Sequence, residues 1–268
     1  MDSGVVLGVG LVVGIIVIAV FATARQKAKK REGLYALETL FRGRSRVDEE
    51  ASTITGTIDG QSVTIRFTSR GGGSSSESWT EVDVAHGVVD VDLGLRPQGL
   101  SENLAIAAGR AIDLQTGDSR FDARFVVEGA PSDIVLRALD APTREALLAR
   151  HGRCDLTTSS PGTLRLGEPG WATDLVRARR LVTTAVGLGT RLRMAHEEVD
   201  RASRQTSAYR DAPGDGGAAE RRAAELEALK AVKEQRAIGE KRMGLVILAV
   251  IFGVLTLTCA HAVFLGGG

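Results

Sequence analysis

Cysteine, histidine and aromatic residues are scarce in this chain. Among its 268 residues there are two cysteines and four histidines, and only 4% of the chain is aromatic. Two cysteines exclude a small secreted domain held together by disulfide bonds. No C-x-x-C, H-E-x-x-H or comparable zinc-binding spacing occurs. The sequence therefore predicts no metal site, no cofactor and no catalytic residue.

Phosphate-binding and hydrolase motifs are also missing. The glycine run at Gly71-Gly72-Gly73 lacks the Gly-Lys-Ser/Thr ending of a P-loop, and no G-x-S-x-G is present. The formal net charge is only +1, and arginines alternate with acidic residues without a basic stripe or an aromatic platform. These absences argue against nucleic acid as a partner.

Long apolar runs are present at both ends of the chain. Residues 3–24 and 243–268 contain no Asp, Glu, Lys or Arg. About 20 helical residues, at ~1.5 Å each, cross a hydrocarbon layer of ~30 Å. We predict one transmembrane helix over residues 4–24 and a second over 244–265. A cleaved signal peptide is the alternative for the first run, but no positive charge precedes it.

The basic residues predict the orientation of these spans. Residues 25–46 contain eight Lys or Arg, and residues 221–242 contain seven. By the positive-inside rule, residues 25–242 lie in the cytoplasm and both termini lie outside a bacterial inner membrane. All six lysines fall within 27–30 or 230–241, beside the spans, where they suit an anionic inner leaflet. The lipid bilayer is thus the first predicted partner.

Small residues in the first span would allow helices to approach each other. Gly4 and Gly8, and Gly10 and Gly14, are spaced as in helix-dimer motifs, so self-association through helices is a possible partner interaction. His261 in the second span lies close to the chain end, and we expect it at the membrane interface, without a role in ion passage.

The middle of the chain predicts an α+β fold, with an antiparallel β-rich cytoplasmic domain and amphipathic helices. We expect a basic juxtamembrane helix over 25–50, with an apolar stripe at Leu34, Leu37, Leu40 and Phe41. The further segments expected are the α+β domain over 51–207, a linker over 208–217 and a helical stalk over 218–243.

Apolar and polar residues that alternate along the sequence predict the strands. Asp59-Gly60 between two alternating runs predicts a hairpin with a type I′ turn. His86-Gly87 suggests a second turn, between strands at 82–84 and 89–95. The clearest single strand is expected from Phe121 to Glu128, and weaker candidates lie at 104–106 and 112–114.

Helix signals begin at Ser132, a suitable N-cap, and Pro142 suits the first turn of a second short helix. A hairpin around Pro161-Gly162 follows, and then a long amphipathic helix over 173–207. Residues 209–217 cannot continue this helix, so we expect a hinge there, or else a tight turn that folds the next helix back. That next helix is expected to be an exposed stalk or a weak coiled coil.

One stretch resembles a known group of proteins. It reads Gly117-Asp118-x-x-Phe121-Asp122-x-x-Phe125-x-Val127 and is followed by a Leu-rich helix. It resembles uncharacterised bacterial membrane-anchored domains of unknown function, in which a Phe-Asp-x-x-Phe-x-Val strand precedes such a helix. The resemblance covers about residues 50–200. It implies a bacterial α+β domain tied to the inner membrane and carries over no site residue.

Two groups of residues suggest chemical sites. His151 and Cys154 have the spacing of a conceivable nucleophile pair, but a capping histidine and a buried cysteine explain them as well. The second group consists of Asp83, His86, Asp90 and Asp92. We expect these residues on an ordinary solvated face of the sheet, and the alternative is a calcium or magnesium site.

The function predicted from the sequence is a non-catalytic binding or scaffolding module held at the inner face of the membrane, with protein partners on its helices. One alternative is a membrane-tethered hydrolase or transferase with an unrecognised site, for which Asp122, His151 and Cys154 are the available groups. The other is a small subunit of a transport or envelope complex.

Overall fold

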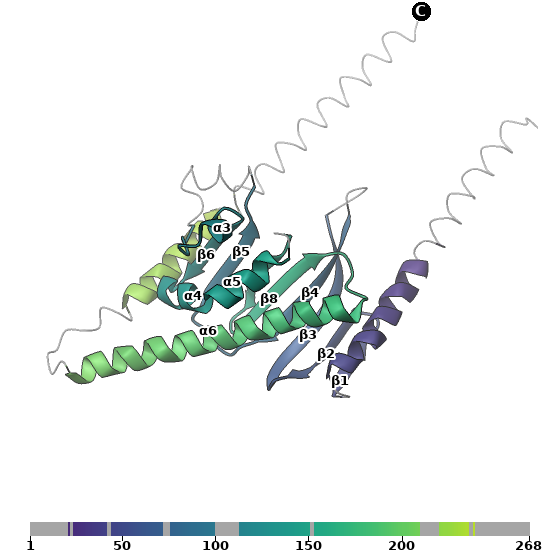
Figure 1. The fold of residues 1–268 in the computed structure, drawn as a ribbon, viewed down its shortest axis with the longest axis horizontal. Coiled ribbons are helices and arrows are strands. Elements are labelled where there is room, and N and C mark those ends of the chain that lie inside the picture. The colour runs from purple at the N-terminus through teal and green to yellow at the C-terminus, as the bar shows by residue number, and fades with distance from the viewer. Residues whose placement is uncertain are drawn as a thin grey trace, which may run out of the picture.

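A single antiparallel sheet of eight strands forms the centre of the molecule (Figure 1). The computed structural model describes residues 21, 24–41, 44–71, 76–99, 113–150, 153–209, 220–235 and 238. The strand order is β1-β2-β3-β4-β8-β7-β5-β6, and every neighbouring pair is antiparallel. The strands are β1 (Ser45–Asp48), β2 (Thr53–Ile58), β3 (Gln61–Arg70), β4 (Glu77–Ala85), β5 (Asp92–Pro97), β6 (Phe125–Ala130), β7 (Asp155–Ser160) and β8 (Thr163–Pro169). The expected α+β class with an antiparallel sheet is confirmed.

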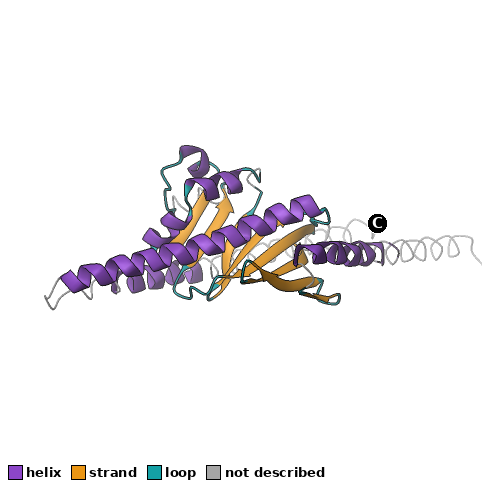
Figure 2. Ribbon diagram, turned by 60° about the horizontal axis from the view of Figure 1, so that its bottom comes forward, coloured by secondary structure: helices purple, strands orange, loops and turns teal. Residues whose placement is uncertain are grey.

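The longest helix, α6 (Leu175–Tyr209), lies across one face of this sheet (Figures 1 and 2). Residues 24–38 and 220–235 are also helical. The remaining helices are η1 (Thr39–Phe41), α3 (Ser119–Asp122), α4 (Ser132–Ala138) and α5 (Ala141–Leu148). The predicted long amphipathic helix is confirmed, because α6 begins and ends within two residues of the expected range.

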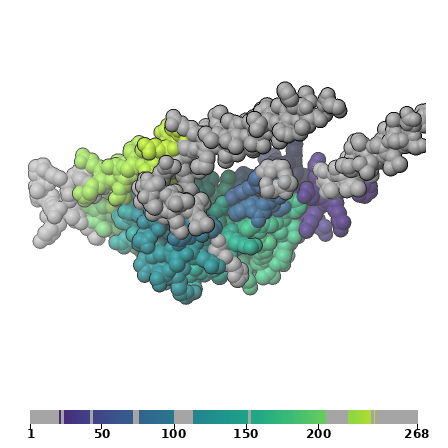
Figure 3. Space-filling model, turned by 90° about the horizontal axis from the view of Figure 1, so that it is seen from above, coloured from purple at the N-terminus to yellow at the C-terminus, as the bar shows by residue number. Residues whose placement is uncertain are grey.

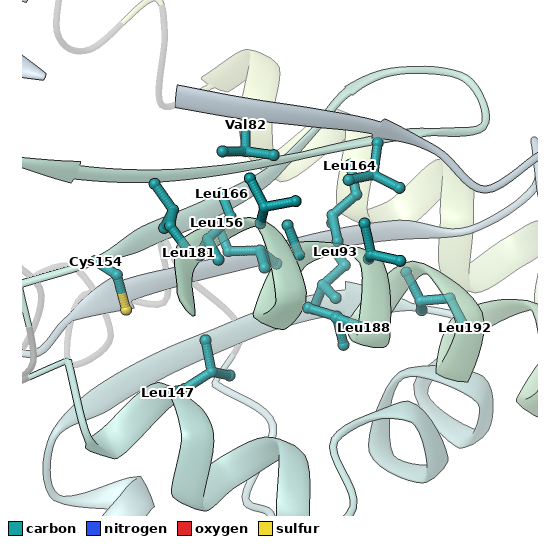
Figure 4. Packing of buried hydrophobic residues seen from close by; sticks show 14 of the residues in the cluster. Val82, Leu93, Leu147, Cys154, Leu156, Leu164, Leu166, Leu181, Leu188 and Leu192 are labelled. Atoms are coloured by element: carbon teal, nitrogen blue, oxygen red, sulfur yellow. The ribbon is translucent and has the colours of Figure 1, made fainter. Parts of the chain in front are cut away.

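The apolar core lies between α6 and the sheet. Leu181, Leu188 and Leu192 of α6 are at most 1% exposed and meet inward-facing strand residues such as Leu164 and Leu166 (Figure 4). Burying one such leucine side chain stabilises the fold by roughly 1.5–3 kcal/mol relative to leaving it exposed. The spacing of apolar residues along α6 therefore determines which of its faces lies on the sheet.

Both predicted hairpins are confirmed. Asp59 and Gly60, which join β2 to β3, have φ angles of 49° and 77°, as a type I′ turn requires. Pro161 and Gly162 join β7 to β8, and Gly162 has a φ of 72°. These turns are local, so a few adjacent residues determine them.

The predicted turn at His86-Gly87 does not join two paired strands. β4 pairs with β3 and β8, whereas the segment after Gly87 leaves the sheet and exposes Val89 before β5 begins at Asp92. The prediction was wrong because β8, about 80 residues further along the chain, occupies the edge of β4. Residues 113–116, at the end of a weaker strand candidate, form no strand, and 104–106 lie outside the described residues.

The strand expected from Phe121 to Glu128 is wrong at its start. Asp118 caps a helical turn, because its side chain accepts hydrogen bonds from the backbone N–H groups of Arg120 and Phe121. The turn forms α3, and β6 begins only at Phe125. Phe121 and Phe125 are both buried, with ring centroids 5.0 Å apart. Ser132 likewise begins α4 but does not cap it, since the N-cap residue is Pro131.

The juxtamembrane helix expected over 25–50 ends early. Leu34, Leu37 and Phe41 are buried as the apolar stripe predicts, but residues 45–48 form β1 and pair with β2. Gly56 of β2 makes room for this arrangement, since a Cβ there would lie 2.4 Å from Phe41 Cδ1. The sheet therefore begins before residue 51, the boundary expected for the domain.

The helix over 220–235 lies against the folded domain (Figure 3). Leu229 is 2% exposed, and Lys233 Nζ lies 2.7 Å from both carboxylate oxygens of Asp92. Glu225 accepts a 3.0 Å hydrogen bond from the backbone N–H of Ser132. These residues therefore do not form the expected exposed stalk. They pack on β5 and α4, and they contact α6, along which the folded-back alternative placed them, where Arg222 Nη2 lies 3.4 Å from Ser203 Oγ.

Several expectations concern residues that the structure does not describe. The spans at 4–24 and 244–265 lie outside the described residues, apart from Phe21 and Ala24, as does the linker beyond Tyr209. In the part of the chain that is described, no helix combines the length and apolar character needed to cross a membrane.

Candidate functional site

A groove lined with arginines runs between α5 and the first turns of α6. Its volume is about 940 Å³. Glu168 and Pro169, at the end of β8, also line it, as do Arg150 and Arg153 from the segment that leads to β7. Small or short side chains leave the space open: Ala146 and Ala149 on one side, and Thr183 and Thr184 on the other.

Capping residues fix the two helices that form the walls. The Asp140 side chain caps α5 by accepting a hydrogen bond from the backbone N–H of Thr143. The carboxylate of Asp174 accepts hydrogen bonds from the backbone N–H groups of Val176 and Arg177 at the start of α6. Such caps satisfy backbone donors that would otherwise remain unpaired, so the positions of both walls follow from local sequence.

The floor of the groove is a buried ion pair. Arg150 Nη1 lies 2.6 Å from Glu168 Oε2, and both side chains are only 9% exposed. Arg177 Nε lies 2.6 Å from Glu168 Oε1, and Arg177 also donates to the backbone oxygen of Pro169. Arg150 Nη2 donates to Thr184 Oγ1 at 3.2 Å. Both oxygens of Glu168 are therefore occupied, while the buried Nε of Arg150 has no hydrogen-bond partner.

The rim carries positive charge that no carboxylate neutralises. Arg153, Arg179 and Arg180 are exposed, and across the described residues none of their guanidinium groups has an ion pair or a side-chain hydrogen bond. Five arginines and two carboxylates give the lining a formal charge of +3. Glu168 is paired and Asp174 caps α6, so the excess charge resides on these three arginines.

This arrangement suits the binding of an anion. A guanidinium group presents a planar set of donors that matches phosphate and carboxylate oxygens, and it remains charged at any physiological pH. The volume of the groove lies within the range of small-molecule sites in proteins, about 300–1,000 Å³. Among the described residues that line the groove there is no histidine, cysteine or serine.

The residues weighed as a nucleophilic site do not form one. Cys154 is completely buried, and burial raises the pKa of its thiol to about 12, so the thiol is not ionised at neutral pH. Asp122 accepts hydrogen bonds from the backbone N–H groups of Thr116 and Gly117, which ties it to its own loop. His151 lies outside the described residues.

The acidic cluster weighed as a cation site is divided among different partners. Asp83 pairs with Arg165 at 2.6 Å, Asp90 with His196 at 3.1 Å, and Asp92 with Lys233. His86 is buried and accepts a hydrogen bond from the backbone N–H of Val88. Within the ranges that the structure describes, no group of three or more His, Cys, Asp or Glu residues could hold a metal ion.

Sequence reasoning missed the groove. Arg177, Arg179 and Arg180 stand close together in the sequence, but Arg150 and Arg153 lie more than 20 residues before them. They come together only because α5 packs beside α6. The available signal was the local excess of arginine over acid in 177–180, which the overall charge balance concealed.

Comparison with known proteins adds only weak structural similarity. No protein-family model matches the chain, and no curated protein sequence matches it. A crystal structure of the mycobacterial trehalose monomycolate transport factor A is similar in part, with a TM-score of 0.38 and 12% sequence identity. The similarity covers 62% of this chain and 94% of that one. A similarity this weak does not indicate a shared function.

Proposed function

We propose that this chain is a two-pass protein of a bacterial inner membrane whose cytoplasmic domain binds an anionic group in the groove between α5 and α6. The domain acts as a non-catalytic binding module. The observation that carries this proposal is a set of three arginines, Arg153, Arg179 and Arg180, that have no side-chain partner among the described residues and lie above the buried Arg150–Glu168 pair.

The geometry supports binding at the rim, with the floor as its foundation. Arg150, which follows α5, and Arg177 of α6 both form ion pairs with Glu168 of β8. These ion pairs hold the three elements together. The rim arginines Arg153, Arg179 and Arg180 form no such ion pair with a described residue. Their side chains therefore lose conformational entropy only when a bound ligand orders them. An anion would therefore find donors that are free at the outset and placed on a rigid base.

Membrane attachment is supported by the two uncharged terminal runs and by the lysines beside them. A non-catalytic role is supported by the described lining residues of the groove, which include arginines and threonines but no pair of nucleophile and base. Nucleic acid remains an unfavoured ligand, because none of the lining residues that the structure describes is an aromatic side chain for base stacking.

Calorimetric titration of the full chain with inorganic pyrophosphate tests the proposal. The chain should be held in a zwitterionic detergent, since an anionic detergent would compete for the groove. We expect binding that weakens at least about tenfold in the R179Q/R180Q variant, because a hydrogen bond to a charged group contributes about 1.5–3 kcal/mol.

The matched control is R201Q/R221Q, which also removes two exposed arginines, one of them from α6, but none from the groove. The control should bind pyrophosphate as the wild type does. No binding by the wild-type chain, or an equal loss in both variants, would contradict the proposal.

A further inference from the structure

We propose that the anionic group bound in the groove is the phosphate of an anionic phospholipid in the same membrane to which the chain is anchored. This inference rests on the proposed function and names its ligand class. Three observations carry it: the groove lies beside the helix that leads to the first span, basic residues lie on that helix, and the lining is partly apolar.

The helix over 24–38 lies beside the segment that leads into α6 (Figure 1). Lys30 Nζ lies 4.9 Å from the centre of the Trp171 ring, a cation–π contact. Gly33 approaches Thr173 so closely that a Cβ at residue 33 would lie 2.7 Å from Thr173 Cγ2. The groove begins at Asp174, directly after these contacts. The groove and the N-terminal helix are therefore neighbours.

The predicted membrane surface is close to this contact. Ala24 is the last residue of the predicted first span and the first of the continuous helix 24–38. Lys30 follows Ala24 by six positions, and six helical steps extend about 9 Å. The groove opening thus lies within reach of the headgroup layer of the inner leaflet.

Basic side chains are present near this contact. Arg25, Lys27 and Lys29 are exposed on the helix between the predicted span and Trp171. Near an anionic leaflet each such charge contributes about 1 kcal/mol of attraction. These charges lie on the helix between the predicted span and the contact with Trp171, so they would concentrate anionic headgroups near that contact.

The lining suits an amphipathic ligand better than a bare anion. Val176 is 58% exposed on the groove side of α6, and Ala146, Ala149 and Pro169 add further apolar surface. A free phosphate would pair with the arginines and leave this apolar surface in water. A phospholipid would place its phosphate on the arginines and its glycerol carbons on the apolar patch, which removes that patch from water.

Photocrosslinking of the full chain in lipid nanodiscs tests this inference. A benzophenone amino acid replaces Val176, and intact-protein mass spectrometry measures the fraction of chain that carries a lipid adduct. We expect about tenfold more adduct in discs with phosphatidylglycerol than in discs of phosphatidylcholine alone, which corresponds to a 1.4 kcal/mol preference. Adding R179Q/R180Q should reduce the adduct to the phosphatidylcholine level, whereas R201Q/R221Q should not change it.

Soluble glycerol 3-phosphate tests whether the lipid phosphate occupies the groove, and an excess of it should reduce the phosphatidylglycerol adduct in the wild-type background. Equal adducts with both lipids would overturn the lipid inference. If pyrophosphate binding then still depends on Arg179 and Arg180, the groove takes a soluble phosphate ester and the proposed function stands; if it does not, both proposals fail. An adduct to a co-purified acidic or phosphorylated peptide in place of lipid would also overturn the inference.

Discussion

Two regions of this molecule are rich in arginine, and they use it differently. On the polar face of the sheet, Arg66, Arg70 and Arg165 all pair with carboxylates of neighbouring strands. In the groove between α5 and α6, Arg153, Arg179 and Arg180 pair with none among the described residues. The arginine content of a surface therefore does not by itself indicate a ligand site. Guanidinium groups without a carboxylate partner are the ones available to bind a ligand.

The sheet network is built to be complete. Glu81 is 5% exposed and accepts hydrogen bonds from Arg70 Nε, at 3.1 Å, and from Thr68 Oγ1, at 3.1 Å. The hydrogen bond that Arg165 donates to Asp83 raises the pKa of Arg165 above its ordinary value. Gly167 makes room for the pair between Arg70 and Asp155, because a Cβ at residue 167 would lie 2.4 Å from Asp155 Oδ1. Satisfied charges of this kind stabilise the fold and leave no donor for a ligand.

The largest effect is expected at the floor of the groove. Arg150→Met removes one partner of a buried ion pair and leaves Glu168 with Arg177 alone. Loss of one partner of a buried pair costs about 3–5 kcal/mol, so the melting temperature of the full chain should fall by roughly 10 °C. Circular dichroism checks this. A variant as stable as the wild type would show that the floor is not structural.

The contrast between these regions also shows what the sequence could predict. Asp59-Gly60 and the apolar stripe of α6 are local patterns, so their structures follow from adjacent residues. The pairing of β4 with β8 depends on a segment 80 residues away, which no local pattern indicates.

Phe121 illustrates a second limit. Two phenylalanines four residues apart fit a buried helical turn as well as one face of a strand, and the Asp118 cap selects the helical turn. The groove could not be predicted because it depends on distant parts of the chain. Arg150 and Arg179 line the same groove only because α5 packs beside α6.

A smaller effect is expected in the sheet network. Glu81→Gln removes the charge that Arg70 and Arg165 share. Hydrogen bonds to charged groups contribute about 1.5–3 kcal/mol, so we expect a loss near 2 kcal/mol and a melting temperature about 4–8 °C lower. Pyrophosphate binding in the groove should not change. Weaker binding in this variant would break the division between the two regions.

A buried histidine outside both regions should make stability depend on pH. Burial, and then the positive charge of Arg193, lower the pKa of His86 from 6.5 in the folded chain. Below about pH 6.5 the unfolded chain therefore binds a proton that the folded chain resists, and stability falls as the pH falls. Melting curves at pH 8 and pH 5.5 should show a smaller decrease for His86→Gln than for the wild type. Identical decreases would remove His86 as a cause.

The smallest effect on stability is expected at the rim of the groove. Arg179 and Arg180 are exposed and unpaired, so R179Q/R180Q should change the free energy of unfolding by less than about 0.5 kcal/mol, as ordinary surface substitutions do. The same variant should lose most of its affinity for pyrophosphate. A large loss of stability would mean that the rim arginines hold the fold together, as those of the sheet do.

The central claim is that the groove binds an anion while the sheet network does not. The most direct measurement is the ¹⁵N NMR signal of each arginine Nε in the full chain during titration with pyrophosphate. The signals of Arg153, Arg179 and Arg180 should shift and saturate together, and those of Arg66, Arg70 and Arg165 should stay in place. Shifts confined to the sheet arginines, or shared equally by all six, would contradict the account.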